Sequence, residues 1–247
     1  MHIFKSMALV SVLFFSSQSF SAVGDVKVLP FFQQKIEGAE LPADSKYDED
    51  YFTIGKVTVT EVDTPIEYLD DKTDVKNLGQ AIMVVDKLIA LGKKIWAIIE
   101  AGRPVLNTSL MTPLSVLPKT DDPDAAFYQM EGWSAPKAVT YRVQYENLFG
   151  MTVIAFDYTV IFQYAGKYEG TGNYITGLNV KASNVSVAWG FNFDANSSLV
   201  NIANRGSSAN PTAGATVQID YKASSVMRTI STSESFHVTG KGSVSKY

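Results

Sequence analysis

The sequence lacks cysteine entirely and has only two histidines, His2 and His237, among its 247 residues. Without cysteine the chain has no disulfide framework, no thiolate metal site and no cysteine nucleophile, so packing and hydrogen bonds must stabilise the fold. A conventional zinc site is also disfavoured, because such sites usually take three or four histidine, cysteine or carboxylate ligands. The composition therefore predicts no cofactor, apart from calcium at one acidic loop.

Charged residues are also scarce, at 19% of the chain against the usual quarter. Residues 22–131 hold 11 Lys and Arg against 19 Asp and Glu, and residues 132–247 hold 9 against 6, so the two parts carry −8 and +3. Neither part contains a run of basic residues. Because nucleic-acid binding needs clustered cations, the composition disfavours a nucleic-acid partner.

The motifs of common enzyme classes are missing, including the phosphate loop and the dinucleotide-binding fingerprint. A Ser-His-Asp hydrolase would have to combine His237 with Asp157 or Asp220, and no Gly-x-Ser-x-Gly motif supports one. Glycoside hydrolysis needs paired carboxylates, for which the predicted strands offer Asp157, Asp194 and Glu146. The sequence favours a protein without catalytic activity and leaves an enzyme of unrecognised type as an alternative.

The N-terminus has the pattern of a secretory signal peptide. His2 and Lys5 precede an apolar run at residues 7–15, and small residues lead to a cleavage position after Ser21 or Ala22. The run is too short to cross a bilayer, which takes roughly 20 apolar residues. We therefore expect residues 1–21 to be a signal peptide, no transmembrane helix after cleavage, and export to a bacterial periplasm or the extracellular medium.

Apolar and polar residues alternate along most of residues 139–193. The two-residue period of residues 139–146 resumes at residues 152–164 and again at residues 185–193. This is the pattern of strands with one buried face. Together with shorter runs nearer the C-terminus, it predicts a mainly β protein whose residues 132–247 form an antiparallel β-sandwich, with about seven to nine strands in all.

Residues 22–131 are predicted to form an acidic region with two or three strands and one long helix over residues 73–101. The apolar positions of this range recur at steps of three and four residues, which is typical of an amphipathic helix packed on a sheet. Thr73 or Asp74 would cap the helix, and Gly102 would end it. The members of the apolar stripe are Leu78, Ile82, Val85, Ile89, Trp96 and Ile99.

Residues 119–136 are predicted to be a long surface loop that carries aromatic residues. Phe127, Tyr128 and Trp133 lie outside the alternating pattern, whereas the aromatic residues within that pattern are expected to form the core. The three loop aromatics are therefore the candidates for contacting a ligand.

The same loop contains three carboxylates, Asp121, Asp122 and Asp124. Their oxygen atoms could converge on calcium, although the spacing is not that of an EF-hand. The alternative is an acidic loop that is simply solvated.

Two classes of function remain after these exclusions. The first is an exported, non-catalytic β-sandwich that binds a glycan, a lipid or an envelope protein. The second is a membrane-active, pore-former-like protein that uses the helix predicted at residues 73–101. An outer-membrane barrel would also alternate apolar and polar residues, but a long helix ahead of the strands is unusual for one.

Overall fold

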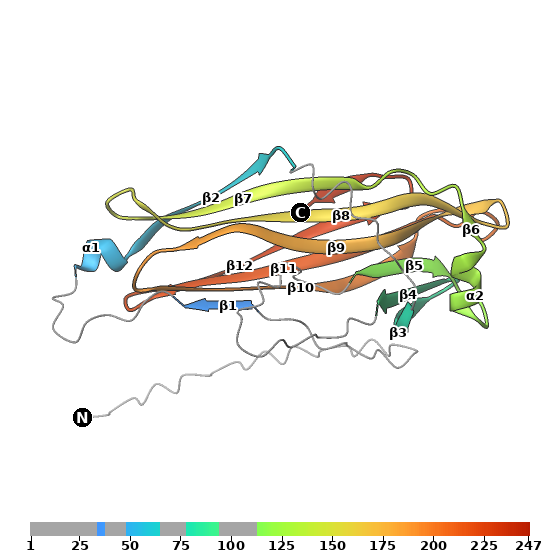
Figure 1. Ribbon diagram of the computed structural model, residues 1–247, viewed down its shortest axis with the longest axis horizontal. Coiled ribbons are helices and arrows are strands. Elements are labelled where there is room, and N and C mark those ends of the chain that lie inside the picture. Colours follow the sequence, from blue (N-terminus) through green and yellow to red (C-terminus); the bar gives the residue numbers. More distant parts are fainter. Residues whose placement is uncertain (1–33, 38–47, 65–77, 94–112) are drawn as a thin grey trace, which may run out of the picture.

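The computed structural model describes residues 34–37, 48–64, 78–93 and 113–247, and Figure 1 shows how they are arranged. The predicted signal peptide lies outside the described residues. The elements in chain order are β1 Gln34–Glu37, α1 Glu49–Phe52, β2 Ile54–Val62, β3 Leu78–Val85, β4 Leu88–Lys93, β5 Leu114–Pro118, α2 Pro123–Tyr128, β6 Met130–Glu131, β7 Lys137–Asn147, β8 Thr152–Tyr168, β9 Thr171–Val187, β10 Phe191–Asn204, β11 Ala213–Ser225, β12 Thr229–Thr239 and β13 Val244–Lys246.

Two antiparallel sheets make up the described fold, which is mainly β as predicted. The eight-stranded sheet has the order β2-β7-β8-β9-β5-β4-β3, with β6 also paired to β8. The five-stranded sheet has the order β1-β10-β11-β12-β13. Strands from the acidic front part pair directly with later strands, as β2 does with β7 and β5 with β9.

The facing sides of the two sheets share one core of aromatic and aliphatic side chains. The ring of Phe156 on β8 lies with its centroid 4.4 Å from that of Phe193 on β10 and 5.3 Å from that of Tyr221 on β11. Tyr158 on β8 likewise contacts Phe236 on β12, at 5.8 Å. The alternating pattern of these strands places one aromatic set inward, so the prediction that most in-phase aromatic residues form the core is confirmed.

The long helix predicted at residues 73–101 is wrong over residues 78–93, where β3 and β4 form a hairpin. The rest of that range lies outside the described residues. Val85 pairs with Leu88 across a turn of Asp86 and Lys87, and Asp86 takes a positive φ of 51°. A membrane-active function that depends on this helix therefore loses its central element.

The error has a physical reason, because both faces of β4 are buried. Leu88 and Ala90 belong to the main core, whereas Ile89 and Leu91 pack with Leu117 in a smaller cluster. A strand buried on both faces is a continuous apolar run, which periodicity alone does not distinguish from a buried helix. Pairing with β3 and β5 satisfies the backbone of β4 and decides in favour of the strand.

The strand predicted at residues 185–193 is divided by a turn that carries the chain from one sheet to the other. β9 ends at Val187, and β10 begins at Phe191. Gly190 has a φ of 78°, and a Cβ at this position would lie 2.4 Å from Cε1 of Phe52. Glycine is therefore needed here both for the left-handed backbone and for the close approach of the ring.

α1 and the β7–β8, β9–β10 and β11–β12 turns gather at one end of the molecule, opposite α2 (Figure 1). We call this the α1 end and define it as residues 48–54, 147–152, 188–190 and 225–228. Hydrogen bonds tie two of these turns to the backbone that connects α1 to β2. In the β7–β8 turn Leu148 N donates to Thr53 O at 3.1 Å, and at the β11–β12 turn Ser225 Oγ donates to Phe52 O at 2.5 Å.

Candidate functional site

The loop aromatics predicted to contact a ligand have different surroundings. Phe127 packs against the smaller cluster that contains Ile89. Trp133 lies over Gly166, where an added Cβ would come within 2.3 Å of the indole ring. Tyr128 is 67% exposed, and its ring centroid is 6.0 Å from that of Phe127. The structure thus gives Phe127 and Trp133 packing contacts and leaves Tyr128 at the surface.

The acidic loop begins a short helix, which the sequence did not predict. Oδ1 of Asp122 accepts hydrogen bonds from the backbone N–H groups of Asp124 and Ala125, both at 3.1 Å, and Pro123 follows the cap. This is the usual chemistry of a helix N-cap. In the part of the chain that the structure describes, no three or more Asp, Glu, His or Cys side chains form a group that could hold a metal ion.

The structure does not assemble the hydrolase considered from the sequence. Nδ1 of His237 lies 3.0 Å from Oγ1 of Thr216, with which it pairs across β11 and β12. Asp220 lies four residues further along β11, a displacement of about 13 Å at the rise of an extended strand. Its Oδ1 accepts instead from Ser233 Oγ at 2.5 Å and from Gln218 Nε2 at 2.8 Å.

Asp157 is held in an ion pair and not in a catalytic pair. Its two carboxylate oxygens accept from Nε and Nη2 of Arg142, both at 2.8 Å, and Oδ2 also accepts from Asn184 Nδ2 at 2.6 Å. Asp157 is 2% exposed, and burial by itself raises its pKa. The hydrogen bonds from Arg142 and Asn184 outweigh burial and hold the pKa below its ordinary value.

Another buried carboxylate, that of Glu234, connects the two sheets. Glu234 on β12 is 8% exposed, accepts a hydrogen bond from the Tyr158 hydroxyl and forms an ion pair with Lys246 Nζ at 2.8 Å. Burial raises the pKa of Tyr158 and Tyr221, and the nearby charge of Glu234 raises both further. Burial also raises the pKa of Tyr145 to about 12. These phenols stay protonated at neutral pH, and they join the sheets in the core.

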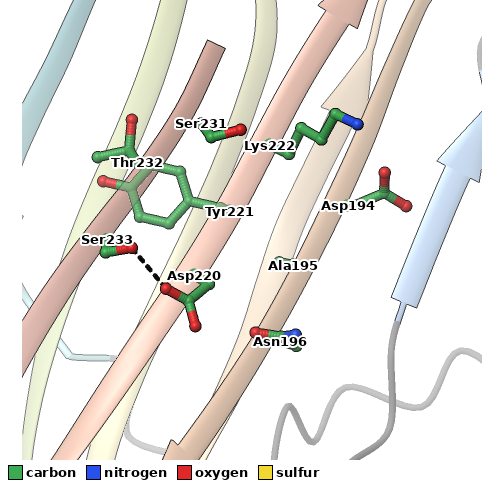
Figure 2. Close-up of a pocket in the computed structure, with 9 residues that line it drawn as sticks. All are labelled: Asp194, Ala195, Asn196, Asp220, Tyr221, Lys222, Ser231, Thr232 and Ser233. Atoms are coloured by element: carbon green, nitrogen blue, oxygen red, sulfur yellow. Dashed lines mark hydrogen bonds between the residues drawn. The ribbon is translucent and has the colours of Figure 1, made fainter. Parts of the chain in front are cut away.

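The outer face of the five-stranded sheet carries an open depression with a volume of about 240 Å³. We call it the polar depression, and Figure 2 shows its lining side chains. Two cross-strand rows form it, because the register places Lys222 beside both Asp194 and Ser231, and Asp220 beside both Asn196 and Ser233. The other lining residues are Ala195, Tyr221 and Thr232.

Strand alternation explains why these side chains are polar. On β10, Phe193, Ala195 and Ser197 point into the core, so Asp194 and Asn196 point outward. On β11 the buried ring of Tyr221 likewise leaves its neighbours, Asp220 and Lys222, on the outer face. The polar depression therefore presents carboxylate, amide, ammonium and hydroxyl groups, with no aromatic ring among its outward side chains.

Two acceptors in the polar depression have no hydrogen-bond partner among the residues that the structure describes. Oδ1 of Asp194 and Oδ1 of Asn196 are buried and make no hydrogen bond. Asp220, by contrast, is fixed by Ser233 and Gln218, and Figure 2 shows its bond to Ser233. The arrangement can accept hydrogen bonds from a ligand at Asp194 and Asn196 and donate them from Lys222.

The sequence does not predict a site on this face. It offers Asp194 as a carboxylate for glycoside hydrolysis and Asp220 as a partner of His237, and it singles out neither Asn196 nor Lys222, Ser231 and Ser233. The available signal is a hydroxyl residue at every second position from Thr229 to Ser235. This signal is weak, because the inward positions between them include the polar residues Thr232 and Glu234.

Among the described residues, no helix combines the length and the hydropathy that crossing a bilayer requires. Comparison of the chain with protein-family models, with curated proteins and with solved structures found no match.

Proposed function

We propose that this protein is an exported, non-catalytic β-sandwich that binds a hydroxyl-rich ligand of the glycan class in its polar depression. The observation that carries the proposal is a pair of buried acceptors, Asp194 Oδ1 and Asn196 Oδ1, for which the described part of the chain provides no donor. A buried acceptor needs a donor, and leaving one unmet costs about 1–3 kcal/mol. The hydroxyl groups of a sugar are donors of this kind.

The neighbouring groups fit the same class of ligand. A sugar hydroxyl both donates and accepts, so it can bridge a carboxylate such as Asp194 and an ammonium such as Lys222, which face each other across β10 and β11. The antiparallel pairing fixes the backbone under these side chains, so little conformational freedom is lost on binding. The depression is open, which suits a chain of sugars better than a fully enclosed small molecule.

Binding without catalysis is supported by the position of His237. It lies outside the polar depression and bonds Thr216, so its imidazole does not adjoin Ser231 or Ser233. Asp157 is engaged by Arg142 on the other sheet and is also remote from this surface.

The experiment is an NMR titration of the full chain with two neutral, hydroxyl-rich probes, maltotriose and N,N′,N″-triacetylchitotriose. We expect backbone amide shifts confined to β10, β11 and β12 near the polar depression. Shifts elsewhere only, or none with either probe, would refute the proposal.

Two variants sharpen this test. Asp194→Ala and Asn196→Ala should each weaken probe binding about tenfold or more, because hydrogen bonds to charged or buried groups contribute about 1–3 kcal/mol. Ser198→Ala is the matched control, since Ser198 lies on the same strand and face but does not line the depression. If all three variants bound the probes with equal affinity, Asp194 and Asn196 would not be part of the binding site.

A further inference from the structure

Five large apolar side chains are exposed at the tips of two hairpins of the α1 end. Leu148, Phe149 and Met151 form the tip between β7 and β8, and Val226 and Met227 form the tip between β11 and β12. Each is between 48% and 55% exposed. Apolar side chains gathered in this way commonly mark a surface that binds a partner or a membrane.

The two tips are held next to each other by one stretch of backbone. Leu148 N bonds to Thr53 O, and Ser225 Oγ bonds to Phe52 O of the same stretch. Arg228 Nη1 donates to Ile54 O at 3.0 Å. Beneath them, the rings of Phe52 and Trp189 pack with centroids 5.7 Å apart. The tips therefore project from a packed base.

The backbone of the first tip has its N–H groups paired within the protein. Asn147 Oδ1 accepts from Phe149 N at 3.1 Å and from Met151 N at 3.0 Å, and Asn147 O accepts from Gly150 N at 3.0 Å. Asn147 is itself buried and donates to Tyr51 O at 3.2 Å. An apolar medium strongly penalises unpaired N–H groups, so a tip with paired N–H groups can enter one at low cost.

In the second tip a serine side chain accepts hydrogen bonds from the backbone, as the Asn147 side chain does in the first. Ser225 Oγ accepts from Met227 N at 3.2 Å and from Arg228 N at 3.1 Å, and Arg228 O accepts from Ser225 N at 2.8 Å. Arg228 follows the apolar pair, and a long basic side chain beside buried apolar groups can keep its charge at the level of lipid phosphates.

We propose that the α1 end attaches the protein to a lipid bilayer by inserting these two tips into its interfacial region. The projecting hairpins with internally paired amides favour a bilayer over a protein groove, because a bilayer accepts separate apolar side chains without matching their shape. Asp48, Glu49 and Asp50 are exposed at the same end as Arg228 and outnumber it, so attraction to anionic lipids is weak. Burial of apolar side chains is then the main driving force, and the preferred surface is zwitterionic.

The test is co-flotation of the full chain with phosphatidylcholine vesicles. We expect binding that changes less than twofold between about 0.1 M and about 1 M salt, over which the Debye length falls from roughly 10 to 3 Å. The double variant Phe149→Ser with Met227→Ser should bind at least tenfold more weakly, while Tyr128→Ser, at the opposite end, should bind like the wild type. Absence of wild-type flotation, or equal flotation of the double variant, would overturn the proposal.

A second measurement locates the tip in the bilayer. Phe149→Trp should show a blue-shifted emission with vesicles and quenching by brominated phosphatidylcholine beyond that of the wild type, whereas Tyr128→Trp should add neither effect. If light scattering showed instead that the wild type self-associates through the tips and the double variant is monomeric, the occupant would be a second copy of this chain and the bilayer proposal would fail. The sugar titration is independent, since its residues lie in the polar depression.

Discussion

At the scale of the residue, His237 shows how its surroundings set the charge of a side chain. Its Nδ1 contacts Thr216, and its Nε2 is buried without a hydrogen-bond partner in the described ranges of the chain. Burial lowers the pKa of His237, and the positive charge of Arg205 lowers the pKa further. The folded protein therefore favours the neutral imidazole, while the unfolded chain protonates near the ordinary pKa of about 6.5.

This difference predicts a loss of stability in mild acid. A depressed folded-state pKa means that the unfolded chain binds the proton first, so the free energy of unfolding falls as the pH drops through about 6.5 toward the folded pKa. His237→Asn retains a polar atom near Thr216 and removes the titration. Urea unfolding between about pH 7 and pH 5 should therefore show a smaller decline for His237→Asn than for the wild type. Equal declines in the free energy of unfolding for the two proteins would show that His237 does not cause the loss of stability in acid.

At the scale of the element, the β3–β4 hairpin separates two side chains that a helix would place together. Val84 and Leu88 are four residues apart, so a helix would align them on one face. In the hairpin Val84 pairs with Ile89 and Leu88 with Val85, and Leu88 is fully buried whereas Val84 is 41% exposed. The fold therefore buries the side chain of Leu88 and leaves that of Val84 largely in water.

The hairpin predicts unequal effects of truncation. Leu88→Ala should lower the free energy of unfolding by about 2–5 kcal/mol, since it leaves a cavity in the core. Val84→Ala should change it by no more than about 0.5–1 kcal/mol, because the side chain is largely in water. Urea denaturation measures both variants. Similar losses at the two positions would contradict the hairpin, which buries Leu88 and leaves Val84 largely in water.

At the scale of the whole molecule, Glu234 joins the two sheets. The carboxylate on β12 of one sheet accepts from Tyr158 on β8 of the other, and Lys246 on the C-terminal strand completes the charge pair. Lys246 Nζ also lies 4.6 Å from the centroid of the Tyr141 ring on β7. Polar pairing therefore supplements the aromatic packing between the sheets.

This network predicts a difference between two buried tyrosines. Tyr158→Phe removes a donor from the buried carboxylate of Glu234 and should cost about 1–3 kcal/mol of unfolding free energy. Tyr221→Phe should cost less than about 0.5 kcal/mol, because its hydroxyl is buried without a hydrogen-bond partner of normal geometry. Chemical denaturation of both variants at neutral pH provides the comparison. A larger loss for Tyr221→Phe would reverse the assignment of the cross-sheet donor.

The candidate site could be predicted from the sequence only in part. Asp194 and Asp220 are visible as acids on alternating strands, and their outward direction follows from their buried neighbours. Their meeting with Lys222 and Ser231 depends on the register of three strands. Register is fixed by the side chains and turns of all the partner strands together, so no local pattern reveals it.

The sequence by itself determined that this is a mainly β protein, because the two-residue period of β7 and β8 is compatible with little else. It also determined that most aromatic residues of this pattern are buried, since alternation assigns them to one face. Only the tertiary structure decided that residues 78–93 form strands, that Asp157 is paired and that the apolar tips meet at the α1 end. The reason is that an apolar run fits a helix or a strand equally well until a neighbouring strand supplies hydrogen bonds to its backbone.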